Sequence, residues 1–202
     1  NLLEWARCLP GLKRFLYISS GAVYGDPTPD HPTTLQPEEG PFNPIEFYGI
    51  MKWACEKIVR RYNELFPLES FSVRFGPVFG PMERPTSSRA GMSMPYHMMR
   101  ALLENRPLRI TPETLKYGRD HISAQDAARA VTELLFKPSL QYPVYNVAMG
   151  RYVTGQQLID ALPETINPLE IELVNAADAE VVMDSSQRYG RWNGYSIERV
   201  YS

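Results

Sequence analysis

RFLYIS, at residues 14–19, is a short apolar and aromatic run, and it predicts a buried strand. In the next regular segment, residues 45–66, apolar side chains recur at intervals of three and four, which predicts one long helix that Pro67 ends. FSVRF, at residues 71–75, predicts the following strand. A buried strand, a long helix and a second strand in this order are typical of an α/β fold with a mainly parallel sheet.

The rest of the chain continues this alternation. We predict helices at residues 1–8, 95–104, 123–136 and 155–162, and strands at residues 108–110, 144–148 and 169–174. Thr154 is a capping residue for the helix that begins after it. Two stretches without periodicity, residues 20–44 and 82–93, predict long loops, and long loops are often functional.

Composition and charge exclude several classes of protein. The chain has 202 residues, with 21 Lys and Arg against 23 Asp and Glu, for a formal charge of -2. Scattered basic residues do not make the positive face that neutralises phosphates, so we expect no nucleic-acid partner. No stretch approaches the roughly 18 apolar residues of a membrane helix, so we expect no membrane partner.

The cysteines and histidines predict neither a disulfide framework nor a metal site. Cys8 and Cys55 lack both a disulfide pattern and a CxxC spacing, which predicts a reducing, cytoplasmic location. His31, His97 and His121 lack the spacing of metal ligands.

Both ends of the chain predict that it is part of a longer protein. The chain opens at Asn1 within a pattern typical of a running helix. It stops after SIERVYS, at residues 196–202, with no capping signal.

Tyr48 and Lys52 are four residues apart on the predicted long helix, so their side chains share one face. A lysine ammonium one turn from a phenol favours the phenolate, and a tyrosine so placed can exchange a proton with a substrate hydroxyl. Ligands of open parallel sheets bind outside the carboxyl ends of the strands. Ser19 and Ser20 end the first strand, so their hydroxyls would face the same crevice.

Two plainer interpretations stand beside this one. Ser19-Ser20-Gly21 can be a turn whose hydroxyls cap its own backbone. Asp126 suits the first turn of its helix, where a carboxylate complements the helix dipole, better than it suits a catalytic acid.

Five segments carry a resemblance to a known family. They are ISSGAVYG (residues 18–25), YGIMKWACE (48–56), RFGPVFGP (74–81), GRDHISAQDAARAV (118–131) and YNVAMGRYVTGQQLIDAL (145–162). In this order they resemble the extended short-chain dehydrogenases/reductases, the NAD-dependent epimerase/dehydratase family. The resemblance implies that Ser20 is the catalytic serine, that Tyr48 is the general acid/base, and that Lys52 binds the nicotinamide ribose.

The resemblance also implies a nicotinamide cofactor, NAD or NADP. Ser19 and the segment Gly76, Pro77 and Val78 would form walls of the nicotinamide pocket. The family places a Gly-rich pyrophosphate-binding turn upstream of the serine strand, and no G-x-x-G-x-x-G occurs in these 202 residues. The residue that selects NAD or NADP lies on the second strand of the family, so this chain does not distinguish the two.

The fold that the resemblance implies is the C-terminal part of a doubly wound Rossmann-like parallel sheet plus a smaller substrate-binding lobe. Residues 1–80 would be the catalytic half of the Rossmann-like domain. Residues 81–202 would be mostly the substrate lobe, with residues 118–150 returning to the sheet. The adenosine-binding half would lie upstream.

Departures from the family narrow the predicted chemistry. Sugar-nucleotide 4,6-dehydratases carry Thr-Asp-Glu where this chain has Ser20-Gly21-Ala22, so a dehydratase is not expected. Members similar to UDP-galactose 4-epimerase have Asn where Pro77 and Met92 stand, so two usual amide contacts to a sugar nucleotide are absent.

Four residues are candidates for substrate contact: Ser20, Arg84, Met92 and Arg119. Arg119 resembles the family's arginine for a substrate anion, and the alternative is a salt bridge to a neighbouring carboxylate, Asp120 or Asp126. Arg84, with Arg89, can hold a uronate or phosphate through bidentate bonds, or can be a solvated loop charge. Met92 packs against the helix that follows it or lines a pocket.

We therefore predict an NAD(P)-dependent oxidoreductase or epimerase that acts on a sugar-like secondary alcohol, either a sugar nucleotide or a sugar acid. The alternative is a non-catalytic member of the fold that serves as a binding or scaffold protein. We also predict a homodimer through the helices at residues 1–8 and 45–66. Ile50, Trp53, Lys57 and Arg61 would lie at the contact, and the alternative is that Trp53 packs inside its own subunit.

Overall fold

A computed structural model describes residues 1–25, 35–87, 89, 91–163, 165–166, 169–183 and 194–202. Its central element is a three-stranded parallel sheet of β1 (Arg14–Ser20), β2 (Glu69–Phe75) and β7 (Val144–Val147), in the order β1-β2-β7. The long helix α2 (Phe47–Leu65) connects β1 to β2. The register pairs Ser19 with Arg74 and Ser20 with Phe75, so both strands end at the same edge. The predicted α/β fold with a parallel sheet is confirmed.

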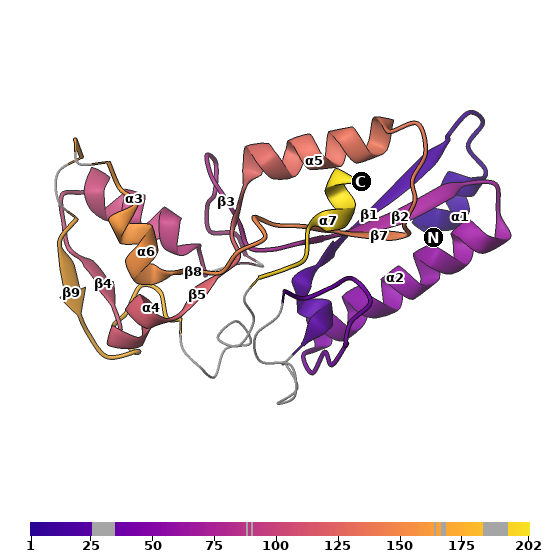
Figure 1. Ribbon diagram of the computed structural model, residues 1–202. Helices are drawn as coiled ribbons and strands as arrows, with labels where there is room; N and C mark the ends of the chain where they lie inside the picture. The colour runs from indigo at the N-terminus through magenta and orange to yellow at the C-terminus, as the bar shows by residue number, and fades with distance from the viewer. Residues whose placement is uncertain (26–34, 88, 90, 164, 167–168, 184–193) are drawn as a thin grey trace.

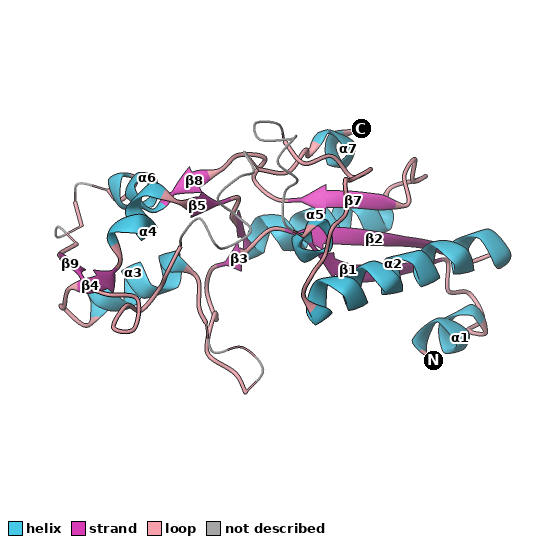
Figure 2. Cartoon of the chain, turned by 90° about the horizontal axis from the view of Figure 1, so that it is seen from below, coloured by secondary structure: helices cyan, strands magenta, loops and turns pink. Residues whose placement is uncertain are grey.

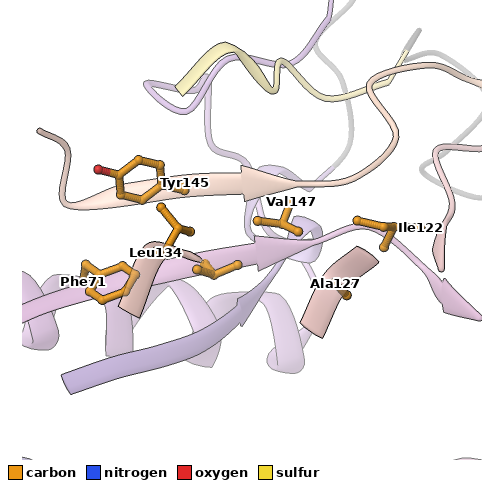
Figure 3. Packing of buried hydrophobic residues seen from close by; sticks show 7 residues of the cluster. Phe71, Ile122, Ala127, Leu134, Tyr145 and Val147 are labelled. Carbon is orange, nitrogen blue, oxygen red and sulfur yellow. The ribbon is translucent and has the colours of Figure 1, made fainter. Parts of the chain in front are cut away.

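Helices cover both faces of this sheet. Helix α2 lies along one face and α5 (Ala124–Phe136) lies along the other (Figures 1 and 2). Between the sheet and α5, one buried apolar cluster joins Phe71, Tyr145 and Val147 of the sheet to Ala127 and Leu134 of the helix (Figure 3). This cluster is the core that holds the sheet together, because burial of such side chains contributes about 1.5–3 kcal/mol each.

The face of β2 under α2 is polar. Ser70, Ser72 and Arg74 occupy every second position of β2 and therefore share that face, and none of them is more than 3% exposed. An ionisable group at this depth needs a partner, so the polar face indicates a built hydrogen-bond network beneath α2.

A second group of elements lies at the opposite end of the molecule from the sheet (Figure 1). It consists of α3 (Met94–Leu103), β4 (Leu108–Ile110), α4 (Pro112–Lys116), α6 (Gly155–Asp160) and β9 (Ile171–Leu173). Strands β4 and β9 pair in parallel, and their own apolar cluster includes Met94, Met98 and Leu108. The expected smaller lobe is therefore present, while the boundary at residue 80 stays a prediction.

Short strand pairs connect the two groups. Strand β3 (Val78–Phe79) pairs in parallel with β6 (Ile122–Ser123), and β5 (Gly118–Arg119) pairs antiparallel with β8 (Val153–Thr154). The remaining elements are α1 (Leu2–Arg7), the 3-10 helix η1 (Gly21–Tyr24) and α7 (Glu198–Tyr201). The sequence analysis missed η1, α4 and these two-residue strands. The predicted strand at residues 169–174 is shorter than expected, and β9 pairs with β4 inside the lobe.

The structure supports the alternative for Trp53, which packs inside its own subunit, while the dimer contact itself stays a prediction. Its indole stacks on Phe42 of the same chain with ring centroids 5.7 Å apart, and Lys57 lies over both rings. The exposed apolar side chains of α2 are others, among them Phe47, Met51 and Ile58. Trp53 therefore faces the loop before α2, and the packing inside its own subunit is confirmed.

Three further features of the described residues concern membrane helices, metal ligands and thiols. No helix among them is long and apolar enough to cross a membrane. None of their His, Cys, Asp and Glu side chains form a group of three or more that could hold a metal ion. Cys8 and Cys55 are free thiols. His31 lies outside the described residues.

Candidate active site

The candidate active site lies at the carboxyl edge of the sheet, where β1 ends in Ser19 and Ser20. The Ser20 hydroxyl accepts a hydrogen bond of 3.2 Å from the backbone N–H of Ala22 and caps η1. The self-capping turn is therefore present. It does not exclude the catalytic role, because a hydroxyl that accepts one hydrogen bond keeps its proton for donation.

Helix α2 approaches this turn closely at its first residues. A Cβ atom added at Gly49 would lie 2.5 Å from the carbonyl oxygen of Ala22 and 3.1 Å from Pro44. Only glycine permits this approach. The close contact holds the first turn of α2, which carries Tyr48, against the segment that follows Ser20.

Tyr48 and Lys52 are on α2, as predicted. The Lys52 ammonium donates a 2.7 Å hydrogen bond to the carbonyl of Ile18, at the end of β1, and lies 5.6 Å from the centre of the Tyr48 ring. The Tyr48 side chain is 54% exposed, so a substrate can reach its hydroxyl. The structure thus brings a phenol and a cation together at the strand end that carries Ser20.

The Ser19 hydroxyl faces away from this open edge. Ser19 is 3% exposed, and its Oγ donates a 2.5 Å hydrogen bond to the carboxylate of Glu56, under α2. The place of Ser19 in the nicotinamide pocket stays a prediction. Its hydrogen bond to Glu56 also connects β1 to α2.

The segment Gly76, Pro77 and Val78 leads from β2 to the lobe. The Gly76 N–H donates to Val147 at 3.2 Å, and the Pro77 carbonyl accepts from Ile122 at 3.0 Å. A Cβ at Gly76 would lie 2.3 Å from the carbonyl oxygen of Asp120. The backbone here is tightly packed at the same sheet edge, and its role as a cofactor wall stays a prediction.

Arg119 lies half-buried on β5, where the sheet meets the lobe. The two carboxylates of the salt-bridge alternative have other partners. Asp120 is 4% exposed and accepts backbone N–H bonds from Met149 and Tyr195, both at 2.8 Å. Asp126 bonds to the Ser123 hydroxyl at 2.8 Å and to Arg129 at 2.7 Å. Asp126 is therefore a helix-start carboxylate, as the plainer interpretation proposed.

The other two candidate substrate residues, Arg84 and Met92, differ in exposure. Arg84 is exposed, and Met92 is buried, with 6% of its surface accessible. Arg89 pairs with Glu83 at 3.0 Å, which favours the loop-charge interpretation for Arg89. Part of the loop at residues 26–43, namely residues 26–34, lies outside the described residues.

Two neighbouring buried groups have shifted pKa values. Burial raises the pKa of Asp120 to about 6, although backbone N–H donors oppose that shift. Burial lowers the pKa of His121 to about 4, and the positive charge of Arg119 acts in the same direction.

Sequence reasoning missed a buried polar network beside the candidate catalytic residues. Arg74 bonds to both carboxylate oxygens of Glu56, at 2.9 and 2.6 Å, and to the Tyr24 hydroxyl at 2.8 Å. The Tyr24 hydroxyl donates to Asn146 of β7 at 2.7 Å. The sequence did contain a signal for this network, because Glu56 and Arg74 are charged residues within a helix and a strand whose patterns predict burial.

The sheet is parallel and has helices on both faces, which is the architecture of Rossmann-like α/β proteins. Its carboxyl edge carries a Ser and a Tyr-x-x-x-Lys pair. Residues 1–148 match the family model described as the NAD dependent epimerase/dehydratase family. The chain therefore belongs to this family.

Relatives within the family include epimerases and reductases. The chain is 29% identical over 165 residues to ADP-L-glycero-D-manno-heptose-6-epimerase of Alkalilimnicola ehrlichii, covering 79% of this chain and 49% of that protein. It is 32% identical over 176 residues to an adenylate-forming reductase of Aspergillus terreus, covering 82% of this chain and 16% of that protein. The chain thus spans about half the length of the heptose epimerase.

One solved structure illustrates the shared fold. The UDP-glucuronic acid 4-epimerase of Bacillus cereus, in complex with UDP-glucuronic acid and NAD, superposes with a TM-score of 0.72. The match covers 98% of this chain and 57% of that one, at 20% identity. The likeness supports a Rossmann-like fold over nearly the whole chain.

Proposed function

We propose that this chain is the catalytic half and substrate lobe of an NAD(P)-dependent oxidoreductase or epimerase that acts on a sugar-like secondary alcohol. The observation that carries the proposal is the Tyr48–Lys52 pair beside the end of β1. There an exposed phenol, a lysine ammonium and the Ser20 hydroxyl share one edge of a parallel sheet.

In this proposal Tyr48 takes the proton from a substrate hydroxyl and returns it in the reverse direction. Ser20 donates a hydrogen bond to the same substrate oxygen and holds it in place. Lys52 favours the phenolate through its positive charge. Such proton transfer contributes typically 10² to 10⁴ in rate.

The residues present fit the nicotinamide end of the cofactor. The Lys52 ammonium is anchored on the Ile18 carbonyl at the strand end, from where it can also bind the ribose hydroxyls. A bound nicotinamide would accept hydride from the substrate carbon and return it. We propose NAD or NADP, and the NAD bound to the Bacillus cereus epimerase supports NAD.

We propose that an upstream half binds the adenosine end of the cofactor. Strand β1 pairs only with β2 among the described residues, so its other edge is open. Four consecutive apolar side chains on it, Phe15 to Ile18, are partly or largely exposed. Further strands that pair with this edge would cover them.

The substrate we propose is a sugar nucleotide or a sugar acid, with Arg119 as the anchor for its negative charge. The heptose epimerase among the relatives supports a nucleotide-linked sugar. Ser20-Gly21-Ala22 in place of Thr-Asp-Glu still argues against a 4,6-dehydratase. The free thiols of Cys8 and Cys55 support a cytoplasmic location, which we also propose.

A substrate screen tests this function. The full-length gene product is incubated with NAD or NADP and with UDP-glucose, UDP-glucuronic acid, an ADP-heptose, free uronates or sugar lactones, and products are separated by chromatography. We expect epimerisation or net oxidation of at least one substrate. Absence of turnover together with absence of cofactor binding would contradict the proposal and support the scaffold alternative.

A further inference from the structure

The carboxylate of Glu56 connects the strand that carries Ser20 to the helix that carries Tyr48. It accepts a 2.5 Å hydrogen bond from Ser19, the residue before Ser20. Glu56 is 4% exposed and follows Lys52 by one helical turn, so Tyr48, Lys52 and Glu56 lie on one stripe of α2. No substrate can reach a side chain at this depth.

Arg74 fixes the orientation of that carboxylate. It forms a two-pronged ion pair with Glu56, a geometry that restricts both groups. Its guanidinium lies 4.9 Å from the centre of the Tyr24 ring and 4.8 Å from that of Phe42, and it donates to the Glu38 carbonyl at 2.9 Å. Arg74 is 3% exposed, and β2, which carries it, is the middle strand of the sheet.

The network continues to the third strand of the sheet. Asn146 on β7 accepts from Tyr24, and its backbone N–H donates to the Glu38 carboxylate at 3.1 Å. Tyr24, Glu38 and Asn146 are all no more than 5% exposed. The buried network thus spans all three strands and α2, next to the carboxyl edge.

We infer that Glu56 is a positioning residue, which acts through Ser19 to fix the distance between Ser20 on β1 and Tyr48 on α2. The inference rests on the proposed function, in which both hydroxyls must reach one substrate oxygen. Lys52 also joins α2 to β1, through Ile18, but the proposed reaction needs its ammonium for the ribose. The proposed reaction assigns no other role to the hydrogen bond between Ser19 and Glu56.

Ser19→Ala is the variant that tests this role. It removes one neutral donor, whereas Glu56→Gln would leave the buried charge of Arg74 without its ion pair. Ser70→Ala is the matched control. Ser70 is 2% exposed on the adjacent strand β2, and its hydroxyl bonds to the Leu68 carbonyl at 3.1 Å, at the far end of the sheet from Ser20.

Three quantities are measured on the full-length gene product, with the best substrate of the screen: kcat, KM and the Kd for NAD. For Ser19→Ala we expect kcat to fall about tenfold or more, because a displacement of about 1 Å can cost 10²-fold. If Ser19 acts only through Glu56, and not as a wall of the nicotinamide pocket, KM and the Kd for NAD should stay within about twofold. Ser70→Ala should change none of the three beyond about twofold.

Hydrogen exchange supplies a readout that does not depend on turnover. Amides of the first turns of α2, residues 47–52, should exchange faster in Ser19→Ala than in wild type, and Ser70→Ala should leave them unchanged. Both variants lose one buried hydrogen bond, so a general loss of stability would affect them alike.

Two results would overturn the inference. One is a Ser19→Ala kcat within about twofold of wild type, measured in a folded protein. The other is a loss confined to NAD affinity, which would return Ser19 to the cofactor wall. An inactive wild-type protein would instead contradict the proposed function, and unchanged exchange at residues 47–52 would then still reject the positioning role.

Discussion

At the scale of single residues, Arg119 is the anchor that we propose for a substrate anion. It lies half-buried on β5, between the sheet and the lobe. Arg119→Ala should raise KM for an anionic substrate about 10-fold to 100-fold with little change in kcat, because a hydrogen bond to a charged group contributes about 1.5–3 kcal/mol. Arg129→Ala on the exposed face of α5 is the control. An unchanged KM in steady-state kinetics would favour the salt-bridge role.

His121 and Asp120 should give opposite pH dependences of stability. The folded protein holds His121 neutral down to pH about 4, whereas the unfolded chain takes up its proton near 6.5, so stability falls as pH falls through this window. For Asp120 the folded pKa is about 6 and the unfolded value 3.8, so the folded state binds the extra proton and stability falls as pH rises. Each contribution is about 3 kcal/mol, and the two largely cancel.

His121→Phe should uncover the Asp120 contribution. The ring contact with Phe79, at 6.1 Å between centroids, can persist with a phenyl group. Relative to wild type, the free energy of unfolding of the variant should rise by about 3 kcal/mol as pH is lowered from 7 to 4. Urea unfolding at several pH values measures this difference. Parallel curves for the two proteins would show that His121 is not held neutral.

At the scale of elements, the start of α2 depends on a glycine. Gly49→Ala adds about 1 kcal/mol of helix propensity, but its Cβ would meet the Ala22 carbonyl at 2.5 Å. Neither backbone can yield without moving Tyr48 away from the segment after Ser20. We expect kcat to fall about tenfold or more. A variant that is more stable and fully active would show that the close approach is not needed.

Long helices and strands could be predicted from the sequence, and very short ones could not. Strands β1 and β2 and helices α2 and α5 are each long enough for their hydrophobic pattern to repeat several times. Helix α4 has five residues, too few for a period, although Thr111 and Pro112 form a start signal before it. The strands of the pairs β3–β6 and β5–β8 have two residues each. Such short strands are recognised only by the strand with which they pair.

The candidate site was predictable where one element carries it. Helical spacing places Tyr48 and Lys52 on one face and the strand end places Ser20, whereas their predicted roles came from the family resemblance. The stack of Trp53 on Phe42 could not be predicted, because Phe42 comes from a loop whose position no local pattern encodes. The Glu56–Arg74 pair was missed for a related reason, since it joins a helix and a strand whose contact depends on the fold.

At the scale of the whole molecule, an apolar surface on α1 and α2 supports the proposed homodimer. The two helices are joined by a hydrogen bond between Tyr62 and Glu4 and by Arg7 over the Phe66 ring (Figure 2). Trp5 on α1 is 63% exposed, and Ile58 on α2 is 51% exposed. The proposed homodimer would bury these exposed apolar side chains.

Light scattering tests the dimer. We expect the full-length protein to be dimeric at about ten micromolar and above, and Ile58→Asp to be monomeric, because a buried unpaired charge at the interface is costly. Leu103→Asp is the control, since Leu103 is 78% exposed on α3, away from this surface. A monomeric wild-type protein at these concentrations would contradict the dimer.

The central claim is that Tyr48 transfers the substrate proton, and the kcat of Tyr48→Phe tests it most directly. Tyr62→Phe is the matched control, because Tyr62 lies on the same helix and its hydroxyl bonds to Glu4. We predict that Tyr48→Phe loses about 10² to 10⁴ in kcat while still binding NAD, and that Tyr62→Phe stays within about twofold of wild type. A Tyr48→Phe enzyme with a kcat within about twofold of wild type would contradict the account.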